Sequence, residues 1–413
     1  MKKLLILSVA ALVACIISLG DGVSPTAAAP PDYTAWTDQG IVYTAPSDAS
    51  AYYPSVVYDA NGFGTSSPLY KMWYSDGNGS VFVVTSTDGI GWGAPTATAG
   101  LGGDAHHVQV LYDANCFGAS PCDPPAVKYK IWYWDTDANL YSINAIAYAE
   151  SSDGVNWTND QALTQDATLV LVTGAGSGWN RGSYGPEYLF YQPSAPNTGS
   201  EPWDYSYVMY YDGTDGSGEV TGLAYSSNGT HWTAYNANPV LYGSATAAWD
   251  CSDDAYGTVY KDANGYHFWY SGSGSDNGSG GCADQPVHQG IGYASSTDGK
   301  NWTKDAGNPI FHITDGVAYR ATRVYTPAVI DDGSGSLKMY YSAQATSADP
   351  KKIGLATLQL PPPSVGGVLG LRGVGSGSPE SDSAVPYYIT LAAAVAAIAL
   401  AAGAWYLRRR WVR

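Results

Sequence analysis

Short runs dominated by aromatic and aliphatic residues recur along the chain, and each is bounded by Gly, Asp, Asn or Ser. The longest of these runs are rich in Tyr and Trp and occupy residues 70–74, 129–133, 207–211, 266–270 and 337–341. Each follows a shorter apolar run, at residues 55–58, 108–112, 188–191, 257–260 and 328–330. Aromatic and β-branched runs of this length between turn residues predict strands. The pattern therefore predicts an antiparallel hairpin that is repeated five times.

One turn motif, Ser-x-Asp/Asn-Gly-x-x-Trp, follows the third strand of four of these units. It occupies residues 86–92, 151–157, 226–232 and 296–302. The Asp or Asn side chain can bond to the turn backbone, Gly supplies a positive φ, and Trp fills the gap beside the hairpin. We therefore expect each unit to contain three to four antiparallel strands.

The repeat predicts an all-β fold, a five-bladed β-propeller over residues 29–360. The fifth unit ends at residues 353–357 without the turn motif, whereas residues 36–43 resemble the segment that follows the motif elsewhere. We therefore expect an N-terminal strand to complete the last blade and close the ring, which removes the exposed sheet edges.

Composition excludes several other classes of protein. A content of 45% hydrophobic and 13% aromatic residues argues against disorder, and heptads of Ala, Glu, Lys and Leu are missing. The formal net charge is −17. A nucleic acid would be repelled by such a protein, so no nucleic-acid partner is expected.

Both ends of the sequence predict a relation to a membrane. Residues 1–28 begin with Met1-Lys2-Lys3 and an apolar run, as an export signal does. Cleavage after Ala28 is favoured over lipidation of Cys15, because the apolar run continues past that cysteine. Residues 361–384 form a Pro/Gly/Ser-rich stalk, and residues 385–413 contain an uncharged stretch followed by three arginines. This pattern predicts a C-terminal transmembrane helix that anchors a monomeric ectodomain to the cell surface.

The cysteines agree with an exported ectodomain. Besides Cys15 the chain has Cys116, Cys122, Cys251 and Cys282, which allow three pairings. Proximity in the sequence favours the disulfides Cys116–Cys122 and Cys251–Cys282. Zinc binding is the weaker alternative, because no CxxC or paired Cys/His spacing accompanies them.

Candidate chemistry gathers just before the first strand of each unit, where a propeller lines its axis. Rare residue types are concentrated there, and carboxyls, cations and aromatic rings are the groups that glycoside chemistry and sugar binding use. The candidate acid, base or nucleophile residues are Glu187, Asp253 and Asp254. The candidate substrate-binding residues are Arg181, Arg320, Arg323, His106, His107, Tyr53, Tyr184, Tyr256 and Tyr325. The alternative is that the charges form structural ion pairs around the axis and that the tyrosines belong to the core.

The strings Tyr-x-x-Trp-Tyr-Ser, Ile-Gly-Tyr-Ala and Ser-x-Asp-Gly-x-x-Trp resemble those of five-bladed propellers of the arabinanase, levansucrase and invertase type, which include glycoside hydrolase families 43 and 32. The resemblance covers residues 36–360. It implies cleavage by an Asp in the first blade, an Asp in the second and a Glu acid in the third. The first blade offers Tyr52-Tyr53-Pro54-Ser55 at that place, without a carboxylate, so the resemblance carries over one residue, Glu187.

Three functions follow as hypotheses. The first is a surface-anchored, glycosidase-like propeller that binds a carbohydrate, with acidic sugars among the candidates, in its axial pocket and hydrolyses it. The second is a carbohydrate-binding or adhesion module without catalysis, and the third is a structural envelope protein. No cofactor or catalytic metal is expected, although an axial ion such as calcium is compatible with the fold. The Asp-Ala-Asn segments at residues 59–61, 113–115 and 262–264 resemble calcium loops, but hairpin turns explain them.

Overall fold

The computed structural model describes residues 30–102, 104–122, 125–135, 145–162, 182–214, 218–244, 249–274 and 289–361. The predicted signal peptide, nearly all of the stalk, and the membrane anchor lie outside these ranges. Among the residues that are described, no helix combines the length and the apolar character needed to span a bilayer.

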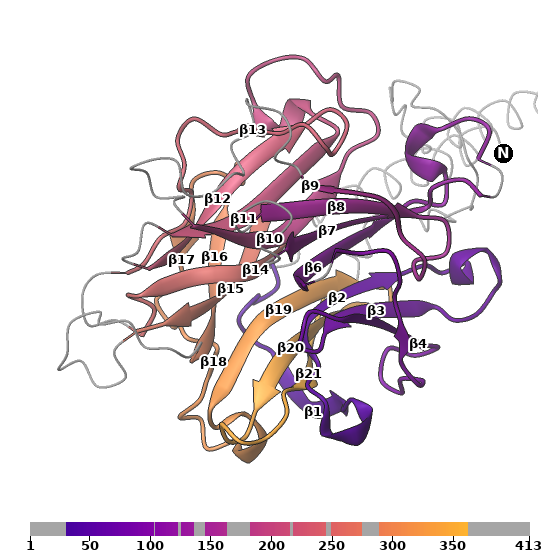
Figure 1. Ribbon diagram of the computed structural model, residues 1–413. Coiled ribbons are helices and arrows are strands. Elements are labelled where there is room, and N and C mark those ends of the chain that lie inside the picture. Colours follow the sequence, from indigo (N-terminus) through magenta and orange to yellow (C-terminus); the bar gives the residue numbers. More distant parts are fainter. Residues whose placement is uncertain are drawn as a thin grey trace, which may run out of the picture. The chain divides into compact units, whose positions relative to one another are not determined.

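The described strands form five antiparallel sheets, each of which is one blade (Figure 1). Blade 1 contains β2 (Tyr52–Tyr58), β3 (Tyr70–Ser75), β4 (Val81–Ser86) and β5 (Thr96–Ala97). Blade 2 contains β6 (Ala105–Tyr112), β7 (Tyr129–Asp135), β8 (Ala145–Ser151) and β9 (Thr158–Ala162). Blade 3 contains β10 (Gly182–Tyr191), β11 (Tyr207–Thr214), β12 (Glu219–Ser226) and β13 (Thr233–Ala234). Blade 4 contains β14 (Asp253–Asp262), β15 (Gly265–Ser273), β16 (Gly290–Ser296), β17 (Thr303–Lys304) and β18 (Phe311–His312). Blade 5 contains β19 (Arg323–Asp331), β20 (Ser336–Gln344), β21 (Lys352–Gln359) and β1 (Thr37–Tyr43).

The aromatic runs become the second strand of each blade, where both faces of the sheet are covered by neighbouring blades. Trp73, Trp132 and Trp269 are fully buried there. A side chain of this size removes about 150–250 Å² from water, so these strands supply much of the hydrophobic stabilisation. The predicted all-β five-bladed propeller is confirmed.

The repeated turn motif has the predicted geometry. In the first copy, Asp88 Oδ1 accepts hydrogen bonds from the backbone N–H groups of Ile90 and Gly91, both at 2.8 Å. Gly89 has a φ of 74°, and a Cβ at this position would lie 2.5 Å from Tyr340 Oη. Glycine is therefore required for both the backbone conformation and the close approach of blade 5.

Each motif also receives a hydrogen bond from the preceding blade. Trp73 Nε1 donates to the carbonyl of Gly154, and Trp132 Nε1 donates to that of Gly229, both at 2.8 Å. Tyrosines do the same at the remaining two motifs, where Tyr210 donates to Gly299 and Tyr340 donates to Gly89. The motif is thus a connector between blades as well as a turn.

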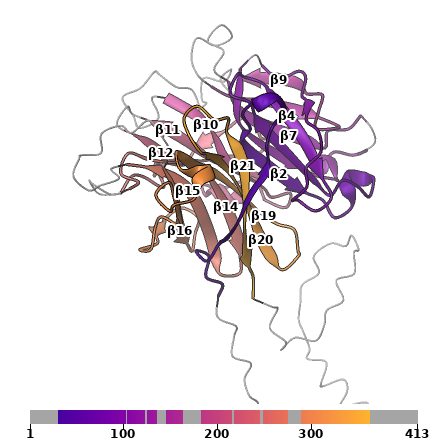
Figure 2. The ribbon, with the colours of Figure 1, turned by 90° about the horizontal axis from the view of Figure 1, so that it is seen from below.

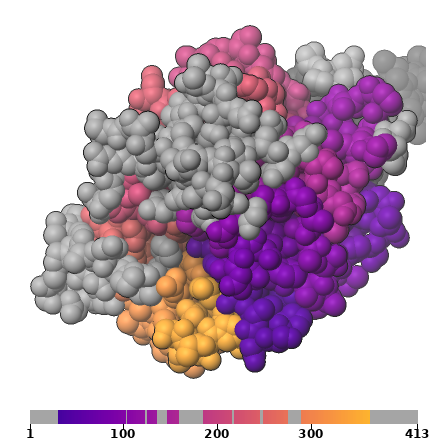
Figure 3. Space-filling model, in the orientation of Figure 1, coloured from indigo at the N-terminus to yellow at the C-terminus, as the bar shows by residue number. Residues whose placement is uncertain are grey.

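Blade 5 lacks the motif, and the N-terminal segment takes its place. β1 pairs antiparallel with β21, and Figures 2 and 3 show the indigo and yellow ends of the propeller side by side. Trp269 Nε1 of blade 4 donates to the carbonyl of Tyr33 at 3.1 Å, as the other blades donate to a motif glycine. The predicted closure of the ring by an N-terminal strand is confirmed.

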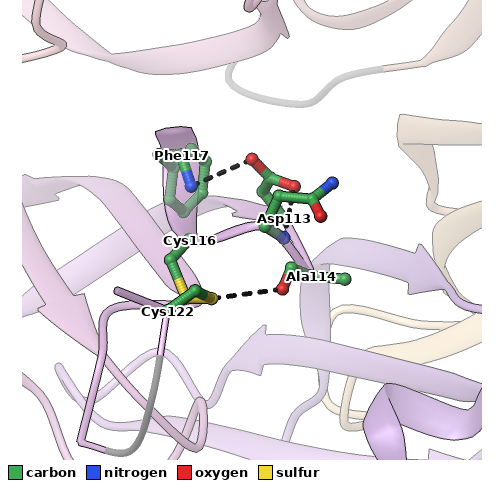
Figure 4. Close-up of a disulfide and its surroundings, with 6 residues drawn as sticks. Asp113, Ala114, Cys116, Phe117 and Cys122 are labelled. Carbon is green, nitrogen blue, oxygen red and sulfur yellow. Dashed lines mark hydrogen bonds between the residues drawn. A yellow bond between two sulfur atoms is a disulfide. The ribbon is translucent and has the colours of Figure 1, made fainter. Parts of the chain in front are cut away.

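The Cys116–Cys122 disulfide is present, with a Cα–Cα distance of 5.6 Å (Figure 4). It closes the turn after β6, in which Asp113 Oδ2 accepts a hydrogen bond from the backbone N–H of Phe117 at 2.9 Å. Cys251 is also disulfide-bonded. Cys282, the predicted partner of Cys251, lies outside the described residues, so that pairing stays a prediction.

A candidate site at the axial throat

The inner strands β2, β6, β10, β14 and β19 run in the same direction along the axis. We call the face where they begin the leading face and the face where they end the trailing face. Near the leading face, four of them carry a residue with positive φ at an irregularity in the pairing: Tyr53, His107, Tyr256 and Thr326. Bulges re-aim side chains, and strained non-glycine residues of this kind concentrate at functional sites.

The rings at these bulges pack together and close the throat. The centroids of Tyr53 and His107 are 3.8 Å apart, those of His107 and Tyr256 are 4.5 Å apart, and those of Tyr53 and Tyr325 are 5.8 Å apart. The cavity that remains, which Glu187 also lines, is about 20 Å³. This is room for about one water molecule. Tyr325 is fully buried and Tyr256 is 8% exposed, so neither offers a free ring face to a sugar in this conformation.

Between blades 4, 5 and 1 the throat is lined by hydroxyl groups. Ser342 Oγ accepts a hydrogen bond from the backbone N–H of Tyr53 at 3.1 Å and lies 2.6 Å from Thr326 Oγ1. Ser271 Oγ accepts a hydrogen bond from the backbone N–H of Thr326 at 2.7 Å. In blades 4 and 5, a serine thus satisfies the backbone of the strained residue in the next blade.

Blade 3 places a carboxyl group at this level. Glu187 is 2% exposed; its Oε1 accepts from Thr221 Oγ1 at 2.8 Å and its Oε2 from the backbone N–H of Gly257 at 3.3 Å. Burial raises the pKa of Glu187 from 4.5 to about 8, although the hydrogen bonds from Thr221, Gly257 and Tyr256 favour the charged form. Glu187 is therefore a protonated acid at neutral pH.

Two further acids, Asp212 and Glu219, lie in this region, and neither is among the site residues predicted from the sequence. Asp212 is fully buried, and its pKa is raised well above the ordinary range by burial and by the nearby charges of Glu219 and Glu187. Glu219 Oε1 accepts a hydrogen bond from Tyr256 Oη at 2.8 Å. A signal for Asp212 existed in the repeat, because it follows the Tyr-Tyr pair of β11 at the position where the other blades have Ser75, Trp134, Ser271 and Ser342.

Asp253 and Asp254 belong to the same end of blade 4 but have structural partners. Asp253 accepts hydrogen bonds from the backbone N–H of Glu219 at 3.0 Å and from the hydroxyl of Ser273. Asp254 is fully buried and lies 2.5 Å from Lys304 Nζ, which also contacts Asp250 at 2.8 Å. Burial raises the pKa of Asp254, while Lys304 opposes that rise. The structure therefore places Asp254 in a buried ion network.

The predicted binding cations are separated by the structure. Arg320, at the end of the short helix η6 (Ala318–Arg320), is 3% exposed, pairs with Asp315 at 3.0 Å and covers the ring of Phe311. It is a structural ion pair away from the throat. Arg323 begins β19 at the leading face, with its guanidinium 5.9 Å from the ring of Tyr325. Arg181 and the side chain of Tyr184 lie outside the described part.

A second polar cluster lies above the throat, around Tyr52. His106 Nε2 is 2.9 Å from Asp104 Oδ1, and Lys351 Nζ is 4.3 Å from the centroid of the Tyr52 ring. The pKa of Tyr52 is raised to about 12 by burial and by Asp76 and Asp104, and the charge of Arg323 opposes this rise. The pKa of Lys351 is lowered by burial and by the charge of Arg323. Two cations therefore share this part of the leading face.

No group of His, Cys, Asp and Glu residues with metal-binding geometry occurs among the described residues. Glu187 and Asp253 accept hydrogen bonds from hydroxyl and backbone donors.

No family model matches the sequence, and no curated protein is similar to it. Solved structures are similar. A protein described as a glycoside hydrolase has a TM-score of 0.55 at 15% identity, over 81% of this protein and 96% of its own length. A protein solved in an RGII complex has the same score at 17% identity, over 85% and 96%. A thermostable family-43 glycoside hydrolase has a TM-score of 0.51 at 14% identity, over 83% and 100%.

The fold is that of the glycoside hydrolase propellers. The resemblance seen in the sequence is confirmed for the architecture, and at these identities the likeness concerns the fold alone.

Proposed function

We propose that this protein is an exported, surface-anchored propeller that binds an acidic carbohydrate on its leading face, over the cluster around Tyr52. The observation that carries the proposal is the pair Arg323 and Lys351. Lys351 lies over the ring of Tyr52 and Arg323 over that of Tyr325, and the charge of Arg323 lowers the pKa of Lys351. A uronate carboxylate would relieve that repulsion and accept charge-assisted hydrogen bonds.

The surroundings of the pair suit a sugar. Asp76, Asp104 and His106 supply groups that can bond to hydroxyls. The ring of Tyr52 is 8% exposed and is covered by Tyr53 and Lys351, so it supports the cluster and does not stack on a sugar. The net charge of the protein does not attract an anion from a distance. Affinity would therefore come from the short contacts of Arg323 and Lys351, and it would fall steeply with salt.

The closed throat supports binding without hydrolysis. A glycosidic acid must reach the leaving oxygen, yet Glu187 is 2% exposed behind a cavity of about 20 Å³. Hydrolysis is the second candidate, and the state of Glu187 favours it, because a carboxyl with a pKa of about 8 is a proton donor at neutral pH. It would require the rings of Tyr53, His107 and Tyr256 to move apart.

The test is titration of the full-length protein with uronic acid oligosaccharides and with their neutral counterparts. Lys351→Gln should weaken binding of the acidic series about tenfold and leave any binding of the neutral series unchanged. Lys300→Gln is the matched control, because Lys300 pairs with Glu201 elsewhere on the surface and its loss changes the net charge equally. Equal effects of the two variants, or no binding of any acidic oligosaccharide, would contradict the proposal.

Analysis of the products separates the two candidates. Cleavage by the wild type that Glu187→Gln abolishes, with binding retained, would establish hydrolysis. Binding without products would establish the non-catalytic function. Binding of the acidic series should also decline at high pH, as Lys351, whose pKa is below the usual 10.5, loses its proton.

A further inference from the structure

A second cavity lies on the axis below the throat, toward the trailing face. It has a volume of about 350 Å³ and is lined by all five inner strands, from Ser55 in blade 1 to Asp331 in blade 5. Gln109 belongs to the lining of both cavities, so the bulges form the boundary between them. Small-molecule sites begin at about this volume.

The walls of this cavity combine aliphatic surface with uncharged polar groups. Leu111 and Ile330 are among its aliphatic residues, and Tyr58, Tyr112 and Tyr260 line it near the ends of their strands. Of the lining residues, Asp331 is the one that carries a charge. The cavity is therefore unsuited to an anion and suited to a neutral molecule with both apolar and hydrogen-bonding parts.

Gln109 and Tyr188 are polar side chains of the lining that are available to such a molecule. The hydroxyls of Ser55 and Thr258 are used by the fold, because they accept the backbone N–H groups of Val110 at 2.9 Å and Val329 at 3.3 Å. The side chains of Gln109 and Tyr188 are partly buried and make no hydrogen bond within the part of the protein that the structure describes. Burial raises the pKa of Tyr188 to about 12, so its phenol remains a donor at neutral pH.

We infer that this cavity is a second ligand site that takes a neutral pyranose-sized ring, with Gln109 and Tyr188 bonding to its hydroxyls. The amide supplies a donor and an acceptor and the phenol a donor, which matches a polyol. The aliphatic walls and the tyrosine rings match the C–H faces of such a ring. Turn carboxylates such as Asp59, Asp113 and Asp262 surround the trailing face and disfavour anionic ligands.

The test uses methyl β-glucoside as the probe, measured by ligand-observed NMR on the full-length protein. Saturable binding in the millimolar range is expected, and Tyr188→Phe and Gln109→Leu should each weaken it about fivefold. Both variants keep the side-chain volume nearly constant, and matched melting curves show that they are folded. Tyr242→Phe, a tyrosine that is 64% exposed on blade 3, is the control and should have no effect.

A second probe, methyl β-glucuronide, distinguishes this site from the leading face. Its binding should respond to Lys351→Gln and not to Tyr188→Phe, whereas glucoside binding should respond in the opposite way. The inference is wrong if the glucoside does not bind, or if its binding is unchanged in both Tyr188→Phe and Gln109→Leu. A crystal soaked with methyl β-glucoside that shows density elsewhere and none in this cavity would also overturn it. The outcomes for the glucoside do not depend on whether the leading face binds acidic sugars.

Discussion

The throat of the propeller satisfies the same backbone requirement in two different ways. Between blades 5 and 1, the N–H of the strained Tyr53 donates to a neutral hydroxyl, that of Ser342. Between blades 3 and 4, the N–H of the equivalent Tyr256 faces the carboxyl of Glu187. The hydroxyl has no charge to lose or gain, whereas the carboxyl must remain protonated to be stable in this environment.

The difference shows where blade 3 departs from the pattern of the other blades. A serine would meet the structural need in blade 3, as it does in blades 4 and 5. Instead, blade 3 collects Glu187, Asp212 and Glu219, whose charges disfavour one another. Arrangements that oppose stability in this way are typical of functional sites.

The largest effect is expected from the protonation of Glu187. Its pKa is raised on folding from 4.5 to about 8, so the folded state holds its proton more tightly than the unfolded state. The free energy of unfolding should therefore be highest below pH 4.5 and fall between pH 4.5 and 8, by on the order of 4 kcal/mol from this group. Chemical denaturation at a series of pH values measures this dependence.

Glu187→Gln should flatten that profile and make the protein more stable than the wild type at pH 8. A wild-type profile that rises between pH 5 and 8, or one that is unchanged in Glu187→Gln, would show that Glu187 is charged in the folded protein.

A smaller effect, with no dependence on pH, is expected on the hydroxyl side. Ser342→Ala removes the acceptor of the Tyr53 N–H and a partner of Thr326. Leaving a buried donor unsatisfied costs about 1–3 kcal/mol. The same denaturation series should give a loss in the free energy of unfolding that is constant from pH 5 to pH 9. A loss that varies with pH would mean that the Ser342 side and the Glu187 side are coupled through the rings of the throat.

The smallest effect is expected from Thr221→Val, which keeps the shape of the side chain and removes the hydroxyl that donates to Glu187 Oε1 at 2.8 Å. The charged form of Glu187 loses one donor, so its pKa should rise further. Stability at pH 8 should fall by about 1 kcal/mol. The pH at which the free energy of unfolding stops falling should therefore be higher than in the wild type. A lower value would contradict the assigned hydrogen bond.

The architecture was predictable because it rests on local patterns that recur. Aromatic runs and the Asp-Gly turn each specify a strand or a turn by themselves, and their spacing counts the blades. The closure of the ring could also be predicted, because the fifth unit lacks the turn motif and residues 36–43 resemble the segment that follows it elsewhere. These local patterns can be recognised without knowing which distant residues contact one another in the fold.

The site was less predictable, because reaching the axis depends on register. Asp212 lies on a second strand rather than before a first one, and a bulge in β10 brings it beside Glu187. Arg320 precedes a first strand, as the prediction required, but η6 turns it toward Asp315. Spacing along the sequence cannot distinguish these cases, since one extra residue in a strand decides which side chains face the axis.

The pairing of β1 with β21 has a mechanical consequence. A pull applied beyond Leu360 would act along β21, which is bonded on one side to β20 and on the other to β1. Its backbone hydrogen bonds lie perpendicular to that direction, so both ladders would bear the load together in shear. β1 is in turn held to blade 4, because Trp269 Nε1 donates to the carbonyl of Tyr33. The blade that contains both ends of the propeller is therefore the one best arranged to resist tension.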